Sequence, residues 1–196
     1  MQNSDKKDIP IYSESVIEFV TVAAEYCASI EGCQGSTRKE FIDRINKISS
    51  LLYLKALLLP DIVCLVQEGL QAYVDEYTYE NVREKISATM GEYDFFLETQ
   101  NSDMQYSDTP ISATISEHLA DVYQDLRDMI ENFKTANEEV MTEAIFDCKE
   151  GFANDWGQKL INAISAMHCI LYSDKNEGQN SDEDFFEVQG DDYKDI

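Results

Sequence analysis

The chain has 196 residues, of which 39 are acidic and 15 are basic, giving a formal net charge of −24 at pH 7 and a pI of about 4.1. This acidity argues against direct nucleic-acid binding, because contacts from Lys and Arg to phosphate supply most of that affinity, and against docking on anionic lipid. Hydrophobic residues make up 43% of the chain, which is enough to fill one core, so we expect a single domain.

The sequence shows no sign of secretion or membrane insertion. No apolar signal-peptide segment follows Lys6 and Lys7, and no apolar run reaches the roughly 18 residues of a membrane span. The five cysteines include no C-x-x-C pair, which argues against a disulfide framework and a cysteine-based zinc site. We expect a cytoplasmic protein with a flexible N-terminus at 1–12, a helical domain at 13–172 and a disordered acidic tail at 173–196.

Apolar residues recur at helical spacing along most of the chain, and no alternating strand pattern is apparent. This predicts an all-α fold, a single bundle of about six helices. The first helix should begin near Ser13 or Ser15 and end at Gly32. The second should begin with a capping box formed by Thr37 and Glu40 and end at Pro60, with residues 57–59, all leucine, inside the bundle.

Residues 61–111 carry 11 acidic and two basic residues and give a weaker pattern. A short helix through Ile62, Leu65, Val66 and Tyr73 is plausible, as is another from Tyr79 to Met90. We expect the remainder of this stretch to be surface loop.

Two long helices are predicted in the second half of the chain. One runs from about Ile111 to Ala136, where apolar residues recur in steps of four and three. The next begins at Asn137, and beside Gly151 and Gly157 its apolar residues are repeatedly four positions apart instead of alternately three and four. These extra steps predict a kink or break at the two glycines.

Carboxylates spaced by one helical turn are candidate metal ligands, because helical bundles use such side chains to bind divalent ions. Most of the acids in the helix from Ile111 lie opposite its apolar stripe, which favours a solvated face, with Asp125 nearer the stripe edge. A second acidic set opens the next helix, where it also stabilises the helix dipole. A metal-dependent hydrolase using Mg²⁺ remains open if the two antiparallel helices bring together Asp121, Asp125, Glu139 and Glu143.

The only tryptophan lies at the predicted kink, next to an amide and a cation. Trp156, Gln158 and Lys159 could line a small-ligand pocket or anchor a partner, together with Tyr123 and Gln124 of the preceding helix. The alternative is that Trp156 is the central core aromatic. The sequence contains no nucleophile elbow, no phosphate loop and no recognisable catalytic set, so we assign no catalytic residue and expect no cofactor.

Five stretches of the chain carry a resemblance to a known family. They read VIEFV at 16–20, YSDTP at 106–110, EHLADVYQDL at 117–126, NEEVM at 137–141 and WGQKL at 156–160. In this order they resemble a bacterial family catalogued as domain of unknown function 5063. The resemblance implies a helical fold and no catalytic residues. The resemblance also implies a nucleic-acid enzyme as a partner, because genes of this family lie near nuclease and RNA-modifying genes.

We therefore interpret the sequence as that of a non-catalytic interaction or regulatory module, more readily than as an enzyme. Its negative field should steer a basic protein partner toward it at low salt. The metal-dependent hydrolase and the small-ligand pocket around Trp156 remain alternative hypotheses. The sequence does not determine the oligomeric state.

Overall fold

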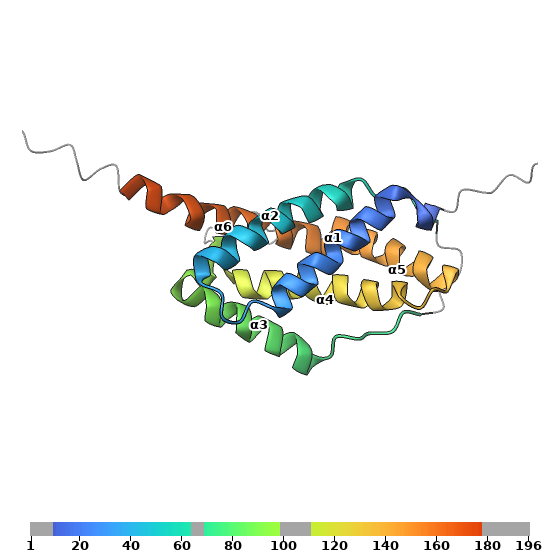
Figure 1. Ribbon diagram of the computed structural model, residues 1–196, viewed down its shortest axis with the longest axis horizontal. Coiled ribbons are helices and arrows are strands. Elements are labelled where there is room, and N and C mark those ends of the chain that lie inside the picture. The colour runs from blue at the N-terminus through green and yellow to red at the C-terminus, as the bar shows by residue number, and fades with distance from the viewer. Residues whose placement is uncertain (1–9, 64–68, 99–110, 178–196) are drawn as a thin grey trace, which may run out of the picture.

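The computed structural model describes residues 10–63, 69–98 and 111–177, which form a bundle of helices with one short hairpin (Figure 1). The described elements in chain order are η1 (Pro10–Tyr12), α1 (Glu14–Glu31), α2 (Arg38–Leu57), α3 (Glu76–Met90), η2 (Gly91–Asp94), β1 (Phe95–Glu98), β2 (Ile111–Thr114), α4 (Ile115–Phe133), α5 (Glu138–Gly151), η4 (Phe152–Trp156) and α6 (Gly157–Glu177). This confirms the predicted helical bundle. Helical structure extends three residues before and five residues beyond the expected domain limits.

The core lies where α4 packs against α1, α3, α5 and α6, while α2 covers α1 and α6 from outside (Figure 1). Tyr26 of α1 is fully buried, and its hydroxyl donates to the carbonyl oxygen of Leu119 in α4 at 2.9 Å. The predicted capping box is present, since the Thr37 and Glu40 side chains each bond the other residue's backbone N–H. No helix in the described part of the chain is long and apolar enough to cross a bilayer.

The prediction that α2 ends inside the bundle is wrong. Leu57 and Leu58 are 58% and 55% exposed, and of the three leucines only Leu59 is buried. α2 packs on α1 and α6 through one face, so consecutive leucines on a helix cannot all point toward its neighbours.

The stretch between α2 and α4 also differs from the prediction. β1 and β2 form an antiparallel pair in which Phe95 lies opposite Thr114 and Glu98 opposite Ile111. We expected loop at β1, and β2 occupies the expected start of the helix from Ile111, so α4 begins only at Ile115. A half-buried strand normally alternates apolar and polar residues. β1 does not, because its outward-facing Phe95 and Leu97 are apolar although they are 70% and 63% exposed. The described residues 61–63 and 69–75 are not helical, and Leu65 and Val66 of the predicted short helix lie outside the described residues.

The predicted kink at the two glycines is confirmed as the π-helix η4, which joins α5 to α6. A π turn takes up more residues than an α turn, so the extra steps of four keep the apolar stripe facing the core. Trp156 is fully buried there, and its indole Nε1 donates to the carbonyl oxygen of Cys148 at 2.9 Å. A Cβ at residue 157 would overlap the Phe152 carbonyl oxygen and lie 2.8 Å from Phe152 Cδ2, so only glycine fits.

Candidate functional site

Two carboxylates of α4, Asp121 and Asp128, are partly covered where the sequence predicted a solvated face, while Glu117 is exposed as expected. Asp121 accepts a hydrogen bond from the hydroxyl of Tyr79 in α3 at 2.6 Å, and Asp128 accepts from the backbone N–H groups of Tyr73 and Val74 at 2.7 and 2.8 Å. α3 and the extended segment 69–75 therefore cover this face. Spacing within α4 could not reveal the cover, because it comes from a stretch with weak helical periodicity.

Lys159 is the cation that faces these acids. Its Nζ lies 2.8 Å from Asp121 Oδ2 and 2.8 Å from Asp155 Oδ2, so it links α4 to η4. Burial works against its charge, but the hydrogen bonds to both carboxylates raise the pKa of Lys159. The structure thus joins two residues that the sequence had assigned to different candidate sites.

An acidic pocket of about 200 Å³ lies beside this ion pair, between α4, α5 and the segment 69–75. Its walls include carboxylates from two helices and the backbone of the covering segment. The lining residues are Leu70, Gln71, Ala72, Asp125, Asp128, Met129, Asn132, Ala144, Asp147 and Cys148. No basic residue is among them, so three carboxylates share a small concave space.

The pocket raises the pKa of two of its carboxylates. Burial raises the pKa of Asp125 to about 6, with further contributions from the charges of Asp155, Asp121 and Asp128, and Lys159 offsets part of the effect. Burial together with Glu143 and Glu150 raises the pKa of Asp147. Lys159 thus compensates the charge of Asp125 only in part, and no cation lowers the pKa of Asp147.

The covering segment is held by polar side chains of α4 and α5. The Asn132 amide exchanges two hydrogen bonds with the backbone of Gln71, at 3.2 and 2.8 Å, and buried Glu143 accepts from the N–H of Gly69 at 3.2 Å. Asn132 and Glu143 thus replace the hydrogen bonds that a helix or sheet would give to these backbone groups. They fix one wall of the acidic pocket.

The four carboxylates proposed as metal ligands do not converge. Asp121 is bonded to Lys159, Glu143 binds the N–H of Gly69, and Glu139 is exposed in the first turn of α5. Within residues 10–63, 69–98 and 111–177, no group of three or more His, Cys, Asp or Glu is arranged to hold a metal ion.

The residues proposed to surround a ligand near Trp156 are also spread apart. Trp156 has no exposed surface, Gln158 donates to Asn162 on the outside of α6 at 2.9 Å, and the Tyr123 hydroxyl donates to Glu31 of α1 at 2.8 Å. Gln124 is half-buried on α4. Trp156 thus takes the core position that we had weighed as the alternative.

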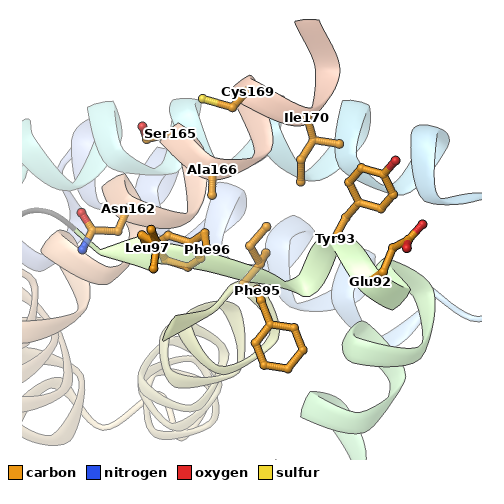
Figure 2. A pocket seen from close by; sticks show the side chains of 11 residues that line it. Glu92, Tyr93, Phe95, Phe96, Leu97, Asn162, Ser165, Ala166, Cys169 and Ile170 are labelled. Atoms are coloured by element: carbon orange, nitrogen blue, oxygen red, sulfur yellow. The ribbon is translucent and has the colours of Figure 1, made fainter. Parts of the chain in front are cut away.

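A second cavity, of about 350 Å³, lies between β1 and α6 (Figure 2). Phe96 and Leu97 of β1 line one side, and Ala166 and Ile170 of α6 lie across from them (Figure 2). The sequence analysis missed this cavity because it depends on the hairpin. The run Phe95-Phe96-Leu97 was the available signal, since it interrupts an acidic stretch with apolar residues, of which Phe96 packs against the core.

A family model described as a domain of unknown function, DUF5063, matches residues 10–173. The chain belongs to this family. Among solved structures it is similar to protein BF1032 from Bacteroides fragilis, a structural-genomics target, with 40% sequence identity and a TM-score of 0.76. That likeness covers 84% of this chain and 96% of the other. A comparison with curated proteins finds no match.

The family match confirms the resemblance and the helical fold, and it includes every residue that lines the acidic pocket. The family description names no reaction. The DUF5063 match ends at residue 173, before the acidic residues 182–195.

Proposed function

We propose that this protein is a non-catalytic interaction module whose acidic pocket receives a Lys or Arg side chain of a basic protein partner. The observation that carries the proposal is the set Asp125, Asp128 and Asp147 around one small pocket without a basic lining residue. Burial raises the pKa of Asp125 to about 6 although Lys159 offsets part of the effect, so a cation entering the pocket would find a carboxylate whose charge is only partly compensated.

Two features favour a side chain of a protein over a free metal ion. The pocket is partly walled by the backbone of segment 69–75, and Asp128 already accepts two backbone N–H groups. A guanidinium or ammonium group needs only a few acceptors and can share them with water, whereas Mg²⁺ requires a near-octahedral set of oxygens.

The global charge supports the same partner chemistry. A net charge of −24 attracts basic surfaces from a distance, while the pocket supplies a short-range contact. A nucleic-acid enzyme fits this description, because its substrate-binding surface must be basic. We place the interaction in the cytoplasm, since the described cysteines Cys27, Cys33, Cys148 and Cys169 are free thiols.

The test separates the pocket from the overall charge. The probe is a fluorescein-labelled peptide of alternating Arg and Ala, and its affinity is measured by anisotropy for wild type, Asp125→Asn, Asp147→Asn and the control Glu25→Gln. Glu25 is an exposed acid on α1, so all three variants remove one negative charge. Loss of a charged contact worth about 1 to 1.5 kcal/mol should weaken binding about 5- to 10-fold in the pocket variants only.

Equal losses in all three variants would mean that the peptide responds to net charge alone, and would refute the pocket as the binding site. A pull-down from lysate uses the same variants. A protein that immobilised wild type retains should be released at high salt, and the double variant Asp125→Asn, Asp147→Asn should not retain it. Retention of that protein by the double variant would contradict the proposal.

A further inference from the structure

Two adjacent cavities form a groove along α6 from Asn162 to Tyr172. The 350 Å³ cavity beside β1 is joined by one of about 730 Å³ between the start of α2 and the end of α6, and both are lined by Tyr93 and Ile170. We call this combined surface the α6 groove. Tyr93 is 38% exposed and Tyr172, which lines the larger cavity, is 48% exposed. The groove therefore presents apolar and aromatic surface.

One rim of the α6 groove is basic. Arg38 and Lys39 line the larger cavity, and the Arg38 guanidinium lies 3.8 Å from the centre of the Tyr93 ring. In the described part of the chain neither side chain forms an ion pair with a carboxylate. The two acids at the groove are Glu92 and Asp43, and Asp43 is paired with Lys47 at 2.7 Å.

This positive rim is unusual for the molecule. α2 carries five basic residues and two acidic ones, whereas the chain as a whole has 39 acidic and 15 basic residues. An apolar groove with a basic rim fits a peptide that combines aromatic and acidic side chains.

The sequence after α6 has this composition. Residues 178–196 contain seven acidic residues and one lysine, and two adjacent phenylalanines lie among the acids in the stretch Asp182-Glu-Asp-Phe-Phe-Glu-Val188. Two adjacent phenylalanines can occupy the smaller, 350 Å³ cavity of the groove, and the flanking carboxylates complement Arg38 and Lys39 beside the larger one.

The chain is long enough to reach the groove. α6 ends at Glu177, and its residues that line the cavity beside β1 run from Asn162 to Ile170, so the return path along the helix is about 10 to 23 Å. Phe185 follows eight residues after Glu177, and eight extended residues span up to about 26 Å. A segment tethered this closely has an effective concentration on the order of millimolar, so even a weak contact is populated.

We propose that residues 182–188 of this chain bind in the α6 groove of the same molecule, with Phe185 and Phe186 in the apolar cavity and the flanking acids beside Arg38 and Lys39. The acidic-aromatic segment then occupies an apolar groove with a basic rim in its own molecule. The proposal is independent of the acidic pocket, because the groove and that pocket share no lining residue.

Cys169 provides the readout, because it lines the groove and is exposed, whereas Cys27, Cys33 and Cys148 are buried. The full chain carrying Cys64→Ser is reacted with iodoacetamide, and mass spectrometry follows the labelling rate of Cys169. In Phe185→Ser, Phe186→Ser the rate should rise about 5-fold or more, and in Tyr193→Ser it should not change. The leucine pair Phe185→Leu, Phe186→Leu should restore most of the protection.

A charge variant tests the other side of the contact. Arg38→Glu, Lys39→Glu should raise the labelling rate of Cys169 as the serine pair does, while Arg83→Glu, Lys134→Glu, which has the same charge change on α3 and after α4, should leave it unchanged. Fluorescence of buried Trp156 verifies that each variant has a native core.

An unchanged labelling rate in the serine pair would overturn the proposal. Protection that disappears on dilution from 100 to 1 μM, roughly the range over which a weak dimer dissociates, would assign the groove to the tail of a second copy and would also overturn it. Protection that is independent of concentration and lost in both the serine pair and the charge variant establishes the intramolecular contact.

Discussion

Replacing Asp125 by Asn should stabilise the protein, and the gain should depend on pH. Burial and the neighbouring acids raise the pKa of Asp125 from 3.8 to about 6. At 1.36 kcal/mol per pKa unit this difference corresponds to about 3 kcal/mol of cost when the carboxyl is ionised. Because the side chain is still partly exposed, we expect about 1 to 2 kcal/mol.

The direction with pH follows from the two pKa values. Below the unfolded value of 3.8 the carboxyl is protonated in both states, so its ionisation costs no stability. As the pH rises from 3.8 to about 6, the unfolded chain ionises first and the folded state loses stability relative to it. Above about 6 the cost is complete, and the advantage of Asp125→Asn should be constant.

Urea unfolding followed by Trp156 fluorescence at pH 4.5, 5.5, 7 and 8 measures this difference. The control is Asp128→Ala, which removes the oxygen Oδ1 that accepts from the N–H groups of both Tyr73 and Val74 and should destabilise the protein at every pH. A lower stability of Asp125→Asn at pH 7, or an equal effect at pH 4.5 and pH 8, would show that ionised Asp125 carries no cost in the folded state.

Three further predictions follow from the geometry. Gly157→Ala should destabilise the protein by about 2 to 3 kcal/mol in urea unfolding, because the added Cβ meets the Phe152 carbonyl and ring, although this exchange normally stabilises a helix by up to about 1 kcal/mol. A gain in stability would contradict the packing of the π turn. Asp94→Ala should cost about 2 to 3 kcal/mol in the same assay, because buried Asp94 accepts from the Ser116 N–H at 2.8 Å and hydroxyl at 2.7 Å; an effect below about 0.5 kcal/mol would be inconsistent with this anchor. In a thermal-shift titration at fixed ionic strength, Mg²⁺ and Ca²⁺ should act alike, and a saturable rise in Tm specific to Mg²⁺ and lost in Asp121→Ala would instead support the metal-dependent hydrolase.

Features of the fold that depend on local spacing were predictable from the sequence. The capping box at Thr37, the end of α1 at Gly32 and the irregular turn between Gly151 and Gly157 each follow from residues within one or two helical turns. The π turn is the clearest case. Apolar residues that are repeatedly four apart, rather than alternately three and four apart, indicate a turn with more residues than an α turn.

The candidate site was only partly predictable, because it depends on contacts between distant segments. Asp121 was singled out, but its partner Tyr79 lies 42 residues earlier, where the helical pattern is weak. Asp128 belonged to the acids expected on a solvated face, although Tyr73 and Val74 of the same earlier stretch donate to it. Without that cover, an acidic helix face is expected to be solvated. Sequence spacing therefore located the carboxylates and could not determine which of them are buried.

The uneven distribution of charge connects the two proposed contacts. A basic partner approaching the acidic pocket is attracted by most of the molecule, but α2, with five basic residues and two acidic ones, would repel it. Residues 178–196, with seven acidic residues and one lysine, carry more than enough negative charge to neutralise α2 when they lie in the α6 groove. Intramolecular binding of this segment would thus remove a repulsive surface without occupying the acidic pocket, because the two sites have no lining residue in common.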